Sequence, residues 1–326
     1  MSAVSCSRQL ATYDHPLDVL TFLQQEKALG ASVALVAVTH TQGGSVRSSG
    51  AVVGVSSREK IAGHISNGCV DGALMFQAMA AMQEQRVSEL RFGAGSPYKD
   101  LQLPCGGAID LLIIPHPDMG VFQTVCEKLK GRQEVNLLLG LDGRVALSDD
   151  PIFKSGWQVD RQRFGLHIRP KLIIRIAGVG AEMMALTRLA VASGYDVIVQ
   201  SPNQEMIGQA VNMGAKQGVR LKGPTSSIAV QDDPWTAFVL LFHDHDWEQA
   251  LLIQALQGPA FYIGALGSLK THALRCEQLR ALGHVSEADI HRIHGPIGLV
   301  PSLRDASMVA VSCLAEIIQK FVEATH

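Results

Sequence analysis

Residues 171–192, KLIIRIAGVGAEMMALTRLAVA, decide the fold class of the C-terminal part of this chain. Leu172–Ala177 is an apolar run typical of a buried strand, and apolar residues recur at helical spacing over Ala181–Ala192. The turn between them, Gly178-Val179-Gly180, is of the kind that brings backbone N–H groups and a helix N-terminus close to a phosphate. This order of strand, glycine turn and helix predicts a Rossmann-like unit.

Strands and helices continue to alternate downstream of this turn. Further strands are predicted at Asp196–Gln200, Ala237–Phe242 and Ala260–Ile263, and further helices at Trp247–Leu256, Leu269–Ala281 and Ser307–Val322. Such alternation indicates parallel strands joined by crossover helices, which form a doubly wound parallel sheet. We therefore expect a Rossmann-like C-terminal domain over residues 169–326.

The N-terminal part combines strands and helices in a less regular order. Helical spacing occurs at Pro16–Leu29 and Cys69–Gln85, and strand-like apolar runs include Ala31–Thr39 and Ala108–Ile114. This mixture predicts a mixed α/β domain over residues 1–118. Residues 119–168 combine a helical segment at Met119–Leu129, a hairpin of Val135–Leu139 and Arg144–Leu147, and an irregular stretch from Gly156. We expect them to connect the two domains rather than to build a third core.

Composition excludes several classes of function. The chain has 326 residues, a formal net charge of −2 and 31 glycines. Near-neutral charge gives no electrostatic reason to bind nucleic acid or an anionic membrane, and no apolar run approaches the ~20 residues of a membrane span. The six cysteines include no CxxC pair, which favours reduced thiols and a cytoplasmic location.

Two cysteines stand beside glycine in the N-terminal part. Cys105 precedes Gly106 and Gly107, which leave its sulfur uncrowded and let a ligand approach the backbone. Cys69 stands where a helix is expected to begin, and helix N-terminal N–H groups lower the pKa of a thiol. The other four cysteines have the setting of small buried apolar residues. We therefore place Cys105 first and Cys69 second as ligand contacts.

Two further segments have side chains suited to binding or proton transfer. Gly43–Gly50 combines flexible backbone, hydroxyl groups and the guanidinium of Arg47, which suits a phosphate, although Arg47 could instead pair with a nearby carboxylate. His243 and His245 follow an apolar strand, at the edge of the sheet where ligands bind in α/β proteins. Their segment could ligate a metal, take part in acid–base chemistry, or simply cap the next helix.

Together these segments resemble the XdhC/CoxI family, whose members help to mature molybdenum hydroxylases such as xanthine dehydrogenase. The resemblance covers most of the chain and is carried by Gly43–Gly50, Ser66–Asp71, Cys105–Gly107, His243–His245, Phe261–Ser268 and Gly295–Leu299. The chain departs from the family pattern at Met183, which replaces the third glycine of the turn, and at Ser201, where the family usually has an acidic residue.

The resemblance implies an accessory chaperone rather than an enzyme in its own right. Such a protein binds the molybdenum cofactor, supports its sulfuration and delivers it to an apo molybdenum hydroxylase. It implies a cysteine desulfurase as a second partner, self-association into a homo-oligomer, and the cytosine dinucleotide form of molybdopterin as an alternative cargo. The implied cofactor-binding positions are Cys105, Cys69, Gly106, Gly107, Arg47, Gly178, Gly180, His243 and His245. No residue is assigned as catalytic, and metal ligands are unknown.

Two other functions remain open from the residues alone. An NAD(P)-dependent oxidoreductase would use the C-terminal domain, with His243 or His245 as the acid–base group. Met183 and the lack of an acidic residue after the second strand make NAD(P) an unfavoured cofactor. A metal-dependent enzyme would be centred on His243–Asp246.

Overall fold

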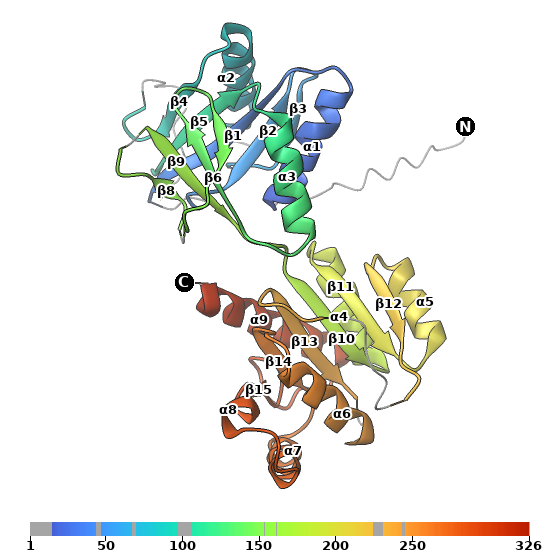
Figure 1. Ribbon diagram of the computed structural model, residues 1–326. Coiled ribbons are helices and arrows are strands. Elements are labelled where there is room, and N and C mark those ends of the chain that lie inside the picture. The colour runs from blue at the N-terminus through green and yellow to red at the C-terminus, as the bar shows by residue number, and fades with distance from the viewer. Residues whose placement is uncertain are drawn as a thin grey trace, which may run out of the picture. The chain divides into compact units, whose positions relative to one another are not determined.

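The computed structural model describes residues 15–43, 47–66, 70–96, 106–152, 154–160, 162–223, 231–242 and 245–325. The chain divides into two compact units, Met1–Pro170 and Lys171–His326, coloured blue to green and yellow to red in Figure 1. Each unit has buried apolar cores of its own. No helix in the described ranges is both long enough and apolar enough to cross a membrane.

The first unit is built on an antiparallel five-stranded sheet with strand order β3-β2-β1-β5-β4. Its strands are β1 (Val33–Gln42), β2 (Val52–Ser56), β3 (Lys60–Ala62), β4 (Ser88–Gly93) and β5 (Ala108–Pro115). Successive side chains of a strand point to opposite sides of the sheet, and in these strands both sets are apolar and buried. Helices therefore cover both faces of the sheet. Helix α2 (Asp71–Glu84) covers one face, and helices α1 (Pro16–Ala28) and α3 (Met119–Lys130) cover the other.

Residues 119–168 complete the first unit. After α3 they form a second, antiparallel sheet with strand order β7-β6-β9-β8. Its strands are β6 (Val135–Gly140), β7 (Val145–Leu147), β8 (Gly156–Trp157) and β9 (Arg163–Ile168). Leu137, Leu139, Phe164 and Leu166 are buried in the same core as α1 and α3. These residues therefore share the core of the first unit and are more than a connection between two domains.

Strand β1 contains a β-bulge at Thr39. Val38 pairs with Leu111 and His40 pairs with Asp110, so Thr39 is an extra residue on this strand. A shift of one residue exchanges the two faces of a strand. As a result Gln42 lies on the same face as Asp110 rather than on the face covered by α2.

The second unit contains a parallel six-stranded sheet with strand order β12-β11-β10-β13-β14-β15. Its strands are β10 (Ile173–Gly178), β11 (Asp196–Ser201), β12 (Gln217–Arg220), β13 (Thr236–Leu241), β14 (Tyr262–Ala265) and β15 (Ile293–His294). Counted along the unit, this order is 3-2-1-4-5-6, which is the Rossmann arrangement. The predicted doubly wound parallel sheet is confirmed.

Helices cover both faces of this parallel sheet (Figure 1). They are α4 (Ala181–Ala192), α5 (Gln204–Asn212), α6 (His245–Leu256), α7 (Leu269–Ala281), the short α8 (Glu287–Ile290) and α9 (Ala306–Thr325). Helices α4 and α9 share one core, and α6 and α7 share the core on the opposite side. The edge strand β12 and helix α5 were not predicted from the sequence.

Candidate functional site

Three connections of the first unit leave its five-stranded sheet at the same end. Gln42 at the end of β1 pairs with Ala108 at the start of β5, which pairs with Gly93 at the end of β4. Ala62 at the end of β3 pairs with Gly54, near the start of β2. The connections 43–51, 63–70 and 94–107 therefore all leave the sheet at one end, which we call the motif end.

Each connection at the motif end contains one of the segments that carry the family resemblance. Cys69 and Cys105 lie outside the described residues, so their placement stays a prediction. Gly43 and Gly107 are close neighbours: Gly43 has φ +74°, and a Cβ atom on it would lie 3.2 Å from the Cα of Gly107. Two of the three connections therefore approach each other through glycine backbone, at a distance that a side chain would disturb.

The other described residues of these segments differ in accessibility. Gly106 has φ +67° and is exposed, and no described atom lies within 4 Å of the position a Cβ would take. The carbonyl of Gly107 accepts a hydrogen bond from the N–H of Ala94, at 3.0 Å. Arg47 is half-buried and already makes an interaction within the protein. The motif end thus exposes backbone at Gly106, whereas Arg47 already interacts with another part of the protein.

Arg91 joins the strands from which these connections depart. Its Nη1 donates to both carboxylate oxygens of Asp110, at 3.0 Å each, and its Nη2 donates to Oε1 of Gln42 at 2.9 Å. Its Nε donates to the carbonyl of Ala94 at 2.8 Å. One guanidinium therefore links β1, β4 and β5 at the motif end, because its three nitrogens donate to three different residues. Sequence patterns did not reveal Arg91, because its partners lie on other strands.

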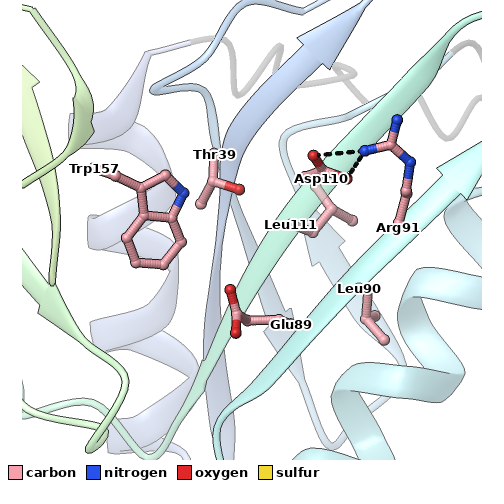
Figure 2. A pocket seen from close by; sticks show the side chains of 7 residues that line it. All are labelled: Thr39, Glu89, Leu90, Arg91, Asp110, Leu111 and Trp157. Carbon is pink, nitrogen blue, oxygen red and sulfur yellow. Dashed lines mark hydrogen bonds and ion pairs between the residues drawn. The ribbon is translucent and has the colours of Figure 1, made fainter. Parts of the chain in front are cut away.

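A pocket of about 390 Å³ lies beside this network, between the five-stranded sheet and Trp157 of β8; we call it the Trp157 pocket (Figure 2). It is lined by Thr39, Glu89, Leu90, Arg91, Asp110, Leu111 and Trp157. Its volume falls in the range of small-molecule sites. Thr39 is the extra residue of the β-bulge, so the irregularity of β1 contributes directly to this pocket.

The glycine turn of the second unit lies where the strand order reverses. A Cβ on Gly178 would lie 2.5 Å from the carbonyl oxygen of Leu241, so glycine is required for β10 to approach β13 at this point. Gly180 has φ +93° and precedes α4 without a side-chain cap. His245 is the first residue of α6, which follows β13, whereas His243 lies outside the described residues. Gly178, Gly180 and the start of α6 therefore belong to one edge of this sheet.

This edge departs from a typical dinucleotide site. Met183, in place of the third glycine, is fully buried in the core between α4 and the sheet. Strand β11 ends in Gln200 and Ser201, both fully buried, where NAD-binding proteins commonly have an acidic residue. The Oε1 of Gln200 accepts a hydrogen bond from Nη1 of Arg175 at 2.8 Å, so Gln200 is directed at a buried ion pair. The half-buried carboxylate of Glu182 lies in the first turn of α4, beside Gly180.

The described cysteines have the character of core residues. Cys126, Cys276 and Cys313 are free and buried, as the sequence predicts. Burial raises the pKa of the Cys126 and Cys313 thiols, which keeps them protonated and poor as ligands. Within the part of the chain that is described, no group of three or more His, Cys, Asp or Glu side chains could hold a metal ion.

Both units match protein families of known membership. Residues 174–317 match the model of the XdhC Rossmann domain, and residues 27–93 match the model of the XdhC and CoxI family. The chain is 32% identical over 306 residues to the molybdenum cofactor insertion chaperone PaoD of Escherichia coli K12, covering 94% of this chain and 88% of that protein. It is also 23% identical over 331 residues to a probable xanthine dehydrogenase subunit of Bacillus subtilis 168, covering 93% of this chain and 96% of that protein.

A solved structure shares the fold. The crystal structure of a xanthine dehydrogenase from Bacillus halodurans matches with a TM-score of 0.75 at 20% identity, covering 93% of this chain and 96% of that chain. The protein is thus a two-unit α/β protein with a Rossmann-like C-terminal unit. It belongs to the XdhC and CoxI family.

Proposed function

We propose that this protein is an accessory chaperone that binds molybdenum cofactor as cargo and inserts it into an apo molybdenum hydroxylase. The observation that carries the proposal is the motif end: the chain segments that contain Gly43–Gly50, Ser66–Asp71 and Cys105–Gly107 all leave one sheet at the same end. The 32% identity to a molybdenum cofactor insertion chaperone supports the same role.

The chemistry of the motif end suits such a cargo. Exposed backbone at Gly106, beside the close approach of Gly43 and Gly107, suits the terminal phosphate of molybdopterin, which backbone N–H groups bind well. The thiolates of Cys105 and Cys69 are soft donors that suit a molybdenum–sulfur centre. We place both cysteines at the cargo because each belongs to a connection that meets the motif end.

The finer steps belong to the same proposal. The bound cofactor would receive its sulfur from a cysteine desulfurase before delivery to the hydroxylase. Gly178 and Gly180 would hold the nucleotide when the cargo is the cytosine dinucleotide form. NAD(P) is disfavoured because Met183 fills the position of the third glycine and β11 ends without an acidic residue. The free cysteines support a cytoplasmic location.

Self-association is part of the proposal as well. Four side chains of α9 are apolar and exposed, and successive ones are three, seven and four residues apart, which places them on one face of the helix: Met308, Val311, Ile318 and Val322. A second copy of the chain would cover such a stripe.

The test is to purify the full-length protein from cells that make molybdenum cofactor and to measure bound pterin, nucleotide and metal. We expect bound pterin in the wild type, and less of it in Cys105→Ala and Cys69→Ala. Cys276→Ala is the matched control, because this cysteine lies in the core of the second unit. Bound NAD(P) with turnover and no pterin would overturn the chaperone function. Pterin retained after loss of both cysteines would overturn only their assignment.

A further inference from the structure

Two charged side chains that line the Trp157 pocket, Arg91 and Asp110, are hydrogen-bonded to each other. Both carboxylate oxygens of Asp110 accept hydrogen bonds from Arg91, and the remaining donors of Arg91 reach Gln42 and Ala94. The charges of Arg91 and Asp110 therefore compensate each other locally. Neither group offers a strong free charge to a ligand, so recognition in this pocket depends on the other polar side chains.

Glu89 provides that recognition group. It lies on β4, opposite Leu112 of β5, and its side chain is exposed. Figure 2 shows its carboxylate directed towards the space between Trp157 and the sheet, with no hydrogen bond to the other residues that line the pocket. An ionised carboxylate is an acceptor only, and it prefers a partner that presents two N–H groups side by side. A phosphate would be repelled.

Trp157 provides an apolar surface across the pocket from Glu89. Its indole ring meets Phe164 edge-on, with ring centroids 5.7 Å apart and an interplanar angle of 77°, which holds the ring in place. Trp157 is half-buried and lines the pocket. Flat nitrogen heterocycles stack well on such a ring, irrespective of their substituents.

Hydrogen bonds of the pocket-lining residues lead from the pocket towards the motif end. Arg91 lines the pocket and is hydrogen-bonded to Gln42, which precedes Gly43, and to Ala94, the first residue of the connection 94–107. The carbonyl of Thr39 accepts a hydrogen bond from Oγ of Ser49, within the Gly43–Gly50 segment. A ligand held in the pocket by its ring can therefore extend its polar end towards the glycine backbone.

From this arrangement we infer that the Trp157 pocket binds the pterin ring of the cargo by its 2-amino-4-oxopyrimidine edge. Glu89 accepts from the 2-amino group and the adjacent ring N–H, and Trp157 stacks on the ring. The inference rests on the proposed function, and it identifies which part of the first unit selects the cargo. About 390 Å³ fits a fused ring, with the dithiolene and phosphate outside towards the motif end.

Binding of a soluble pterin to the full-length protein tests this inference directly. The probe is biopterin, titrated by the quenching of its fluorescence, against the analogue in which a 2-oxo group replaces the 2-amino group. We expect the wild type to prefer biopterin by about tenfold or more, the effect of losing a hydrogen bond to a charged group. Glu89→Gln should abolish this preference, whereas Glu84→Gln, an exposed carboxylate on α2 outside the pocket, should retain it.

The stacking surface has its own pair of variants. Trp157→Leu should weaken binding of biopterin about tenfold, and Trp157→Phe should recover part of that loss. Thermal unfolding of each variant checks that the first unit is folded, since Trp157 also contacts Phe164.

The outcomes separate the inference from the function. Equal binding of the two probes by the wild type, or equal behaviour of Glu89→Gln and Glu84→Gln, would overturn the pocket assignment. Guanosine has the same donor edge, so tighter binding of guanosine than of biopterin would overturn the assignment to a pterin. Wild-type protein isolated from cofactor-producing cells without bound pterin would overturn the proposed function, whatever the probes do.

Discussion

At the scale of single residues, Arg91 holds three strands together at the motif end. Replacing it by lysine keeps the charge but removes the separate N–H donors that bind Asp110, Gln42 and Ala94 at the same time. We expect Arg91→Lys to destabilise the first unit by about 1–3 kcal/mol and to reduce cofactor retention. Urea unfolding and pterin content measure the two effects. Arg86→Lys, an exposed arginine beyond α2, is the control, and equal effects of both variants would contradict the role of Arg91.

Glu26 gives the first unit a pH dependence of known sign. Its buried carboxylate accepts from Nζ of Lys60 at 2.8 Å and from Oγ of Ser56 at 2.7 Å. The hydrogen bond from Lys60, followed by that from Ser56, holds the pKa of Glu26 below its usual value of 4.5. When the pKa of a carboxyl group is lower in the folded than in the unfolded state, the group stabilises the protein fully at a pH above its unfolded-state pKa. This stabilisation is lost as the pH falls through the folded-state pKa.

The expected result is therefore lower stability of Glu26→Gln at pH 7, with a smaller difference from the wild type below pH 4.5. Urea unfolding between pH 3 and pH 7 measures it. Glu84→Gln, exposed on α2, should follow the wild type throughout. A difference between Glu26→Gln and the wild type that does not change with pH would show that the ion pair contributes nothing through its charge.

At the scale of elements, the contact between β10 and β13 depends on the absence of a side chain. Gly178→Ala would place Cβ 2.5 Å from the carbonyl oxygen of Leu241, so one strand must move. We expect a loss of more than about 2 kcal/mol, as for other strained core substitutions. Gly208→Ala is the matched control: Gly208 is exposed on α5 with open space around the new Cβ, so the change should stabilise by about 0.5–1 kcal/mol. Thermal unfolding measures whether each substitution raises or lowers stability. If both substitutions stabilised the protein, the close packing of β10 on β13 would be contradicted.

The same scale explains what could be predicted from the sequence. Strands β10, β11 and β13 are buried on both faces, so each is an apolar run that stands out in the sequence. Strand β12 lies at the sheet edge, where its residues are exposed or only partly covered, and it carries no such pattern. Residues 156–169 carry no strand pattern either, because β8 has only two residues, Gly156 and Trp157, and its partner β9 is interrupted by glycine.

The candidate site likewise contains residues that local sequence patterns reveal and residues that depend on strand pairing. The glycine segments could be found because their composition is local, and the structure places Gly43 and Gly107 together. Glu89, Arg91 and Trp157 were missed, because a pocket formed by paired strands and a bulge depends on register, which single-sequence patterns do not reveal. The roles of Cys69 and Cys105 stay predictions.

For the whole molecule, the division into two units makes a prediction about fragments. Each unit has its own sheet and its own cores, so residues 15–170 and residues 171–326 should each fold when expressed alone. Circular dichroism and a cooperative thermal transition measure this. The first fragment should keep the preference for biopterin over its 2-oxo analogue, and the second should not have it. An unfolded first fragment, or pterin selectivity in the second, would contradict the division of roles.

The bulge at Thr39 also affects how relatives of this protein are compared. Because β1 contains one residue more than its partner strand, positions after it are offset by one from those before it. An ungapped alignment with a relative whose strand is regular would equate Gln42 with a residue that faces the opposite side. Residue equivalences across β1 should therefore be drawn from strand pairing, with a one-residue gap at Thr39, before any position in this region is compared between homologues.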